Sequence, residues 1–413
     1  MSISVSTLAA VFFLIAIRQV GNVRLQIWHI MTLGALVVLF TGQISLRQAA
    51  AAVNLDVILF LFGMFVIGQA LEESGYLAHL AYRYFKRAHS MNALLLLVIF
   101  GFGLGSGFLM NDTLAIIGTP VVLLLSRKHD IPARLLLLAL AFSVTIGSVM
   151  SPIGNPQNLL IALNGRVPNA FVDFFRWLFI PTIVNLLVVF AVLRWAYNGD
   201  FHDAPLNHSQ EPIRNRELAM LSRISLQMVV VLIFLKILTI ALGLRVEFRL
   251  TYIALASCLP ILVGSPRRWR IVRRVDWSTL IFFAAMFVLM ESVWLSGFFQ
   301  ALLARTTIPL TSVEMILGVS TVLSQFVSNV PLVALYQPVL LHAGATVKGF
   351  MALAAGSTIA GNLLILGAAS NVIIIQNAEK RSHHSIAFWE FARLGIPLTI
   401  VNIAVYWVFF RVL

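Results

Sequence analysis

The sequence has few charged residues and almost no cysteine, and each shortage excludes a class of protein. Asp, Glu, Lys and Arg make up 11% of the 413 residues, whereas about 25% is usual in a soluble domain. The single cysteine, Cys258, excludes a framework of internal disulfides. The strand-like alternation of polar and apolar residues is also missing, which argues against an outer-membrane barrel.

Apolar residues make up 60% of the chain. Runs of about 18–20 apolar residues, the length that a helix needs to cross a bilayer, recur along the whole sequence. We therefore predict an all-α integral membrane protein whose partner is the lipid bilayer. The first run, from Val5 to Ile17, has no basic n-region before it and no A-x-A site, so we expect a retained span and not a cleaved signal.

The net charge of +13 comes from basic residues in short loops between apolar runs, as the positive-inside rule expects, so no nucleic-acid partner is needed to explain it. No nucleotide-binding loop, Ser-His-Asp set or zinc-ligand spacing is present in the sequence. We therefore expect neither an enzyme nor a bound cofactor, and an ATP-driven pump is disfavoured.

The chain divides into two similar halves. The polar stretch 198–222 predicts a cytoplasmic linker between a first repeat over 1–197 and a second over 223–413. Landmarks recur in the same order in both halves, and such internal symmetry is typical of transporters. The paired landmarks are Gly42 with Gly264, Met64-Phe65-Val66 with Met286-Phe287-Val288, Ser74-Gly75 with Ser296-Gly297, Asn111 with Asn329, Pro120 with Pro338, Gly154 with Gly367, Asn158 with Asn371, and Ile180-Pro181 with Ile396-Pro397.

Loop charges predict that the two repeats are inverted. The loop 265–276 holds five arginines, while its counterpart 43–54 holds only Arg47. The bias reverses in the next loop pair, because 76–90 is the basic member and 298–310 is not. By the positive-inside rule, the halves then have opposite orientations in an inner membrane, with both termini in the periplasm. We expect about ten transmembrane helices, two re-entrant hairpins over 92–126 and 311–345, and two broken helices.

Four polar breaks interrupt otherwise apolar sequence, and irregular backbone at membrane depth requires protein or water partners. Freed helix N-termini suit an anion, and amide and carbonyl oxygens suit Na⁺. The alternative is that these small and amide residues serve only the packing of neighbouring membrane helices. The breaks are Asn111-Asp112-Thr113, 151–158, 328–331 and 367–371.

Asp112 is the most informative single residue, because a carboxylate inside a bilayer is costly. It could hold a coupling cation or carry a proton. The alternative is that Asp112 caps a helix beginning at Thr113. The counterpart of Asp112 in the second half is Val330, so the halves are not chemically equivalent.

Several motifs resemble those of the ion transporter superfamily, which includes arsenite efflux permeases, divalent anion:sodium symporters and citrate-transporter-like permeases. The matching segments are Leu71–Tyr76, Phe108–Thr113 with Thr119-Pro120, Gly154–Asn158 and Ser328–Pro331. The resemblance implies an elevator mechanism, with a scaffold over roughly 1–75 and 223–297 and a transport domain holding the hairpins and broken helices. It also implies a homodimer.

We therefore expect a secondary active transporter of a small anion or oxyanion-type solute, coupled to H⁺ or Na⁺. Arsenite or antimonite efflux and Na⁺/H⁺ antiport stay open as alternatives, and a channel or an intramembrane enzyme are rivals from other classes. The predicted solute-binding residues are Asn111, Thr113, Asn155, Gln157, Asn158, Ser328, Asn329, Ser370 and Asn371. The predicted coupling-ion residues are Asp112, Asn111, Gly154 and Asn158, with Na⁺ near Asn111, Asp112 and Asn158.

Overall fold

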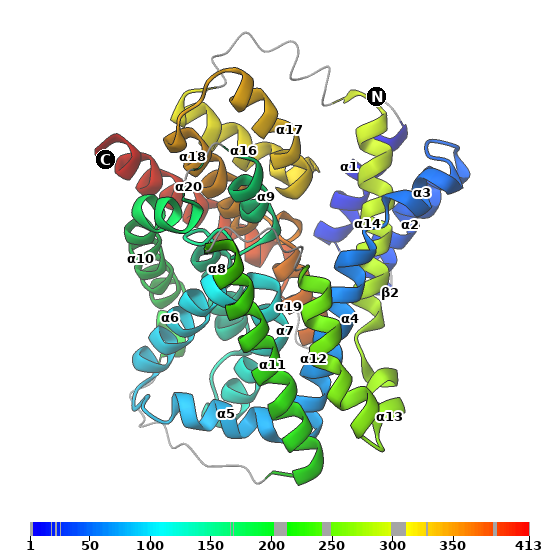
Figure 1. The fold of residues 1–413 in the computed structure, drawn as a ribbon, viewed down its shortest axis with the longest axis vertical. Coiled ribbons are helices and arrows are strands. Elements are labelled where there is room, and N and C mark those ends of the chain that lie inside the picture. The colour runs from blue at the N-terminus through cyan, green and yellow to red at the C-terminus, as the bar shows by residue number, and fades with distance from the viewer. Residues whose placement is uncertain are drawn as a thin grey trace.

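The computed structural model describes residues 3–17, 19–20, 23–24, 26–165, 167, 169–201, 213–241, 249–298, 311–327, 329–382 and 386–412. Apart from the two-residue strands β1 (Gln19–Val20) and β2 (Val23–Arg24), its regular elements are helices (Figure 1). The predicted all-α class is therefore confirmed.

The first half holds α1 (Ile3–Ile17), α2 (Ile27–Phe40), α3 (Leu46–Ala52), α4 (Leu55–Glu73), α5 (Tyr76–Phe85), α6 (Met91–Leu109), α7 (Asn111–His129), α8 (Ala133–Ser148), α9 (Pro156–Asn164), α10 (Ala170–Ala196) and the 3₁₀ turn η1 (Asn198–Asp200). The second half holds α11 (Arg216–Ala241), α12 (Leu250–Gly264), α13 (Arg268–Arg274), α14 (Trp277–Leu295), α16 (Val313–Val327), α17 (Asn329–His342), α18 (Val347–Ile359), η2 (Ala360–Asn362), η3 (Ile365–Gly367), α19 (Ala369–Ser382) and α20 (Phe388–Val412).

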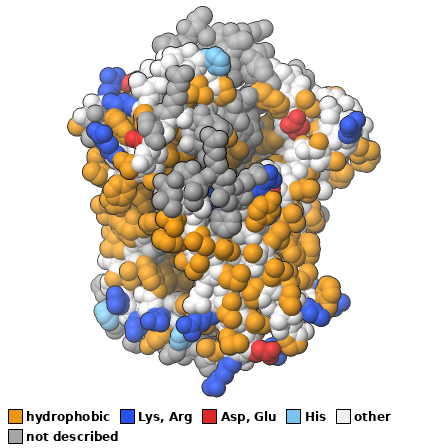
Figure 2. Space-filling model, viewed as in Figure 1, with side chains coloured by type: hydrophobic (Ala, Val, Ile, Leu, Met, Phe, Trp, Pro, Cys, Tyr) orange, Lys and Arg blue, Asp and Glu red, His pale blue; other side chains and the backbone are white. Residues whose placement is uncertain are grey.

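Six helices in the described part of the chain are long and apolar enough to cross a membrane, and five shorter helices of 10–17 residues are also apolar. Large side chains such as Phe13, Phe40 and Val263 are exposed on them. Figure 2 shows a broad band of hydrophobic side chains, with charged side chains mainly above and below it. This surface is suited to lipid and not to water.

The helices pack in two groups. In Figure 1 most of the first group lies to the right and most of the second to the left, whereas α11 of the first group crosses the middle of the view. The first, here the α4–α14 group, contains α1 to α4, α11, α12 and α14, with main pairings α4 on α12, α11 on α12 and α2 on α14. The second, here the α7–α19 group, contains α6 to α10 and α16 to α20, with main pairings α6 on α8, α16 on α18 and α7 on α19. The two groups meet mainly where α4 touches α7 and α14 touches α19.

Small residues allow the closest crossing in the α7–α19 group. A Cβ atom added to Gly147 on α8 would lie 1.8 Å from the carbonyl oxygen of Gly103 on α6. The two backbones therefore touch directly, as is common between membrane helices. This crossing holds α8, which leads into the first broken helix, against the first arm of the predicted hairpin.

The predicted breaks differ from the structure in their exact ends. Residues Asn111 to Thr113 lie inside the first turn of α7, so Met110 alone connects α6 to α7. The predicted loop between half-helices is present between Ser148 and Pro156. In the second half, the break holds the two short turns η2 and η3 before α19 begins.

Candidate functional site

The first hairpin turns sharply at Met110 and rests on the first broken helix. Met110 has φ of 66°, an uncommon value for a residue with a side chain, and is buried. The next residue, Asn111, donates its backbone N–H to the carbonyl oxygen of Gly154 at 3.0 Å. Its side-chain Oδ1 accepts the backbone N–H of Asp112 at 2.9 Å. The tip is therefore tied to the loop before α9.

Asp112 does not cap a helix beginning at Thr113, so that alternative is wrong. α7 begins at Asn111, and the side chain of Asp112 projects from its first turn. Its Oδ1 is buried and has no hydrogen-bond partner in the part of the chain that the structure describes. A carboxylate oxygen of this kind requires a proton, a cation or a solute donor as its partner.

The amides of Asn155 and Asn158 hold the first break together. Asn155 accepts the backbone N–H of Asn158 at 2.8 Å, and its Nδ2 donates to Ser148 Oγ and Thr358 Oγ1 at 3.1 and 3.2 Å. Asn158 Nδ2 donates to the carbonyls of Ser148, Val149 and Ser151 at 3.1, 3.2 and 3.0 Å. Thr358 Oγ1 donates to Asn158 Oδ1 at 3.2 Å. Both side chains therefore satisfy the carbonyls and N–H groups that the break frees.

The second half repeats part of this arrangement. Asn329, the first residue of α17, donates Nδ2 to the carbonyl of Gly367 at 3.1 Å. Asn371 Nδ2 donates to the carbonyl of Gly361 at 2.6 Å. Ser370 is fully buried, and its Oγ has no partner among the described residues. The tip of α17 therefore rests on the second break through an asparagine and a glycine, as the tip of α7 rests on the first.

A cavity of about 480 Å³ lies between the two helix groups, at these tips. Its polar lining comes from Asn54, Asn111, Asp112, Gln157, Glu291 and Asn329. Its opposite wall is apolar and belongs mostly to α14. That wall consists of Phe282, Phe283, Met286, Phe287, Met290 and Trp294. No Lys, Arg or His is among the described residues that line the cavity.

Four helix N-termini converge on this cavity. Its lining includes the first residues of α7, α9, α17 and α19, namely Asn111, Pro156, Asn329 and Ala369. The N-terminus of a helix carries a partial positive charge of roughly +0.5 and free backbone N–H groups. The cavity therefore offers partial positive charge without a cationic side chain.

The predicted site residues fall into three classes in the structure. Asn111, Asp112, Gln157 and Asn329 line the cavity. Six others are not among the lining residues, namely Thr113, Gly154, Asn155, Asn158, Ser370 and Asn371, and Ser328 lies outside the described residues. The described residues contain no cluster of three or more His, Cys, Asp or Glu suited to a metal.

Sequence reasoning did not identify the apolar wall or Asn54. The wall residues recur at intervals of three and four along α14, which places them on one helix face. That periodicity was the available signal, although it is equally typical of ordinary helix packing. Glu291 lies within the same face and is the second carboxylate at the cavity.

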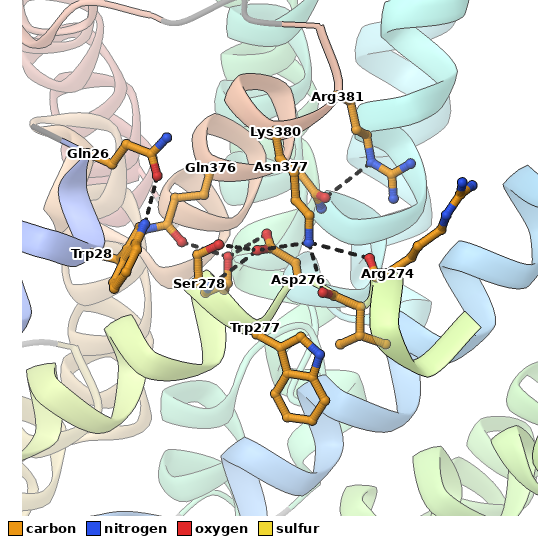
Figure 3. A network of polar contacts seen from close by, with 12 residues as sticks. Gln26, Trp28, Arg274, Asp276, Trp277, Ser278, Gln376, Asn377, Lys380 and Arg381 are labelled. Atoms are coloured by element: carbon orange, nitrogen blue, oxygen red, sulfur yellow. Dashed lines mark hydrogen bonds and ion pairs between the residues drawn. The ribbon is translucent and has the colours of Figure 1, made fainter. Parts of the chain in front are cut away.

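A polar network joins α19 to the α4–α14 group at the end of the molecule that carries α13, here the basic end (Figure 3). Lys380 lies 3.7 Å from the buried carboxylate of Asp276 and donates to the carbonyl of Val275 at 2.8 Å. Thr279 Oγ1 donates to Gln376 Oε1 at 2.6 Å.

The network continues to α4, because Arg381 forms an ion pair with Glu72. Glu73 pairs with Arg270 of α13 at 3.2 Å. Since α19 begins at the cavity and ends at this network, the network joins the two groups at one end of their boundary.

Comparisons with known proteins agree with a transporter. The family described as citrate transporter matches residues 11–350. The chain is 31% identical over 373 residues to the "46 kDa membrane protein" of Mycobacterium leprae, with 85% of each chain covered. It is 27% identical to the "Silicon efflux transporter LSI3" of Oryza sativa subsp. japonica, with 90% of each covered.

Among solved structures, the chain is similar to the YdaH transporter of Alcanivorax borkumensis, at 15% identity and a TM-score of 0.49, with 86% of this chain and 84% of that one covered. The superfamily resemblance of the hairpin motifs is confirmed by the family match, and the family and its relatives are transporters and not enzymes. This multi-pass membrane protein belongs to the citrate transporter family.

Proposed function

We propose that this protein is a secondary active transporter of a small oxyacid or oxyanion solute, coupled to protons that bind at Asp112. The observation that carries the proposal is the cavity itself. There the unpartnered carboxylate of Asp112 stands beside four helix N-termini, at the boundary between two separately packed helix groups.

The electrostatics of the cavity favour a solute with oxygen atoms. Four N-termini of roughly +0.5 each supply about two positive charges, and their N–H groups donate to oxygen. Asn111, Gln157 and Asn329 add amide groups, which both donate and accept. The name of the rice relative, a silicon efflux transporter, supports the inclusion of uncharged oxyacids in the solute class.

Hydrogen bonding favours H⁺ over Na⁺ as the coupling ion. The Oδ1 of Asn158 already accepts from Thr358, and the carbonyl of Gly154 already accepts from Asn111. Two of the oxygens that we expected for Na⁺ are therefore in use inside the protein. The carboxylate of Asp112 is not, and one carboxylate suffices to carry a proton across a bilayer.

Matched contacts support the inverted-repeat proposal. Asn111 and Asn329 are sequence counterparts, and each hydrogen bonds a member of the counterpart pair Gly154 and Gly367. The amides of Asn158 and Asn371 each donate to a carbonyl ten residues earlier in the chain. Related sequences that make related contacts are what two inverted copies of one unit would produce.

Alternating access would follow from movement of the α7–α19 group past the α4–α14 group, as in an elevator. The cavity lies at the boundary between these groups, so a displacement there would change which side of the membrane it faces. The inner-membrane location, the periplasmic termini, the linker over 198–222 and the homodimer remain predictions from the sequence and the resemblance.

The test is solute uptake into proteoliposomes under imposed H⁺ or Na⁺ gradients, with a panel of oxyacids and carboxylates. We expect uptake to follow the H⁺ gradient and Asp112→Asn to abolish that dependence while the protein stays folded. Asp130→Asn is the matched control, because Asp130 lies at the exposed opposite end of α7. Uptake that ignores both gradients would favour a channel.

A further inference from the structure

A second carboxylate faces the cavity from the wall opposite Asp112. Glu291 lies on α14, in the α4–α14 group, and its half-buried side chain lines the cavity. It has no hydrogen bond or ion pair with any residue that the structure describes, and its carboxylate oxygens are not among the fully buried atoms. Its neighbours along the wall are Phe287, Met290 and Trp294.

Placing such a carboxylate within a membrane-spanning helix costs free energy, so we expect it to have a role in solute binding. Acidic side chains within membrane-spanning helices are rare, and those that lack a structural partner mark a functional site. The other residues of α14 that line the cavity are apolar, so Glu291 is the one acid that this helix contributes to the lining. Its sequence counterpart in the first half is Gln69, an uncharged residue, so the acid is specific to this wall.

The charges around the cavity nearly cancel when both carboxylates are ionised. The four helix N-termini supply roughly two positive charges in total. Asp112 and Glu291 supply two negative charges, and no cationic side chain among the described residues lines the cavity. With a net charge near zero, the cavity suits an uncharged solute. When Asp112 takes up a proton, the net charge of the cavity becomes more positive by one unit, which suits a solute with a single negative charge.

We propose that Glu291 determines the charge of the accepted solute and so restricts the transporter to weak oxyacids in their uncharged form or to a monoanion that travels with a proton. This inference rests on the proposed function and makes its solute class narrower. Multiply charged anions are rejected because they would meet the carboxylate of Glu291 in an apolar setting, where charges repel strongly.

The size of the effect follows from Coulomb's law. Two unit charges about 8 Å apart, at an effective dielectric constant of about 20, change a binding constant roughly 30-fold. Removing the charge of Glu291 should therefore raise the binding constant of the solute by roughly 10- to 30-fold for each additional negative charge that the solute carries.

The experiment compares arsenite, which is uncharged at neutral pH, with arsenate, which is an anion, in proteoliposomes. Phosphate and citrate serve as further anions. We expect the wild type to prefer arsenite and Glu291→Gln to raise the arsenate-to-arsenite uptake ratio about tenfold or more. Glu291→Asp, which keeps the charge, should leave the ratio close to that of the wild type. Glu217→Gln removes an exposed acid at the start of α11 and should not change the ratio.

The outcomes separate this inference from the function on which it rests. If solute moves but Glu291→Gln leaves the ratio unchanged, or if the wild type prefers the multiply charged citrate to arsenite, the role of Glu291 is wrong and the transporter proposal survives. If the wild type moves no solute under any gradient, the proposed function fails. In that case anion binding, measured as a rise in melting temperature with phosphate or citrate, still decides the role of Glu291. A rise in Glu291→Gln but not in the wild type supports it, and equal rises overturn it.

Discussion

The backbone N–H of Asn111 donates to the carbonyl oxygen of Gly154 at 3.0 Å, and this bond ties the first hairpin to the first broken helix. The loop that carries Gly154 is packed so tightly that a Cβ atom at this position would lie 2.1 Å from the carbonyl oxygen of Ser148. The contact is with backbone, which cannot move aside as a flexible side chain can. The position of Asp112 beside the cavity therefore depends on a glycine that does not itself line it.

We expect Gly154→Ala to abolish transport and to lower the melting temperature of the detergent-purified protein, because the loop before α9 must shift. Gly199→Ala is the matched control, since no atom lies within 4 Å of the Cβ position at Gly199. Both variants can be compared by thermal unfolding and by proteoliposome uptake. Normal activity in Gly154→Ala would show that the bond between Asn111 and Gly154 does not set the site.

Asn158→Asp should act on stability. The substitution replaces an amide that donates to three carbonyls with a group that only accepts when ionised. Two buried carbonyls and the part-buried carbonyl of Ser151 would lose their donor, and a charge would enter a fully buried position. We expect a loss of about 2 kcal/mol or more in the free energy of unfolding, measured as a lower melting temperature. An unchanged melting temperature with altered solute affinity would instead favour the direct solute contact that the sequence suggested.

Gln157→Ala provides the contrast, one residue away on the same helix. The side chain of Gln157 lines the cavity and has no hydrogen-bond partner among the described residues. We expect weaker solute binding with little change in melting temperature, because no structural bond is lost. The measurement is the KM for uptake of the best solute from the panel. A Gln157→Ala protein with unaltered KM would exclude this amide from solute recognition.

The sequence supported more of the fold than of the site. The repeated pair Ser74-Gly75 and Ser296-Gly297 ends two helices in the same way, since both glycines have φ near 70–77° and both serine hydroxyls bond a carbonyl three residues earlier. Composition and spacing were enough to predict these elements, because helix ends and apolar runs depend on neighbouring residues.

The division of labour among the polar residues could not be predicted in the same way. Asn155, Gln157 and Asn158 are close in sequence, yet only Gln157 lines the cavity. The direction of each side chain depends on where α9 begins, and on Thr358 from the other half of the chain. Such long-range contacts leave no local pattern. The same holds for Glu291, whose importance follows from its position opposite Asp112.

The network at the basic end leads to a prediction about conformation. Lys380 and Asp276 join α19 to α14, and we predict from the loop charges that this end is cytoplasmic. We expect Lys380→Gln to favour the state in which the cavity opens to the cytoplasm, because a contact across the boundary between the two helix groups is lost. Accessibility can be measured with Ala369→Cys at the cavity, in a Cys258→Ser background that removes the only native cysteine.

A membrane-impermeant maleimide added from the cytoplasmic side should then label Ala369→Cys faster in Lys380→Gln than in its parent. Reversing the pair, with Lys380→Asp and Asp276→Lys together, should slow the labelling again, although each single reversal should speed it. Such rescue separates the attraction between these two residues from general loosening, because a merely damaged protein would not recover when a second change is added. If the double reversal labels as fast as the singles, the pair does not hold the cytoplasmic side closed.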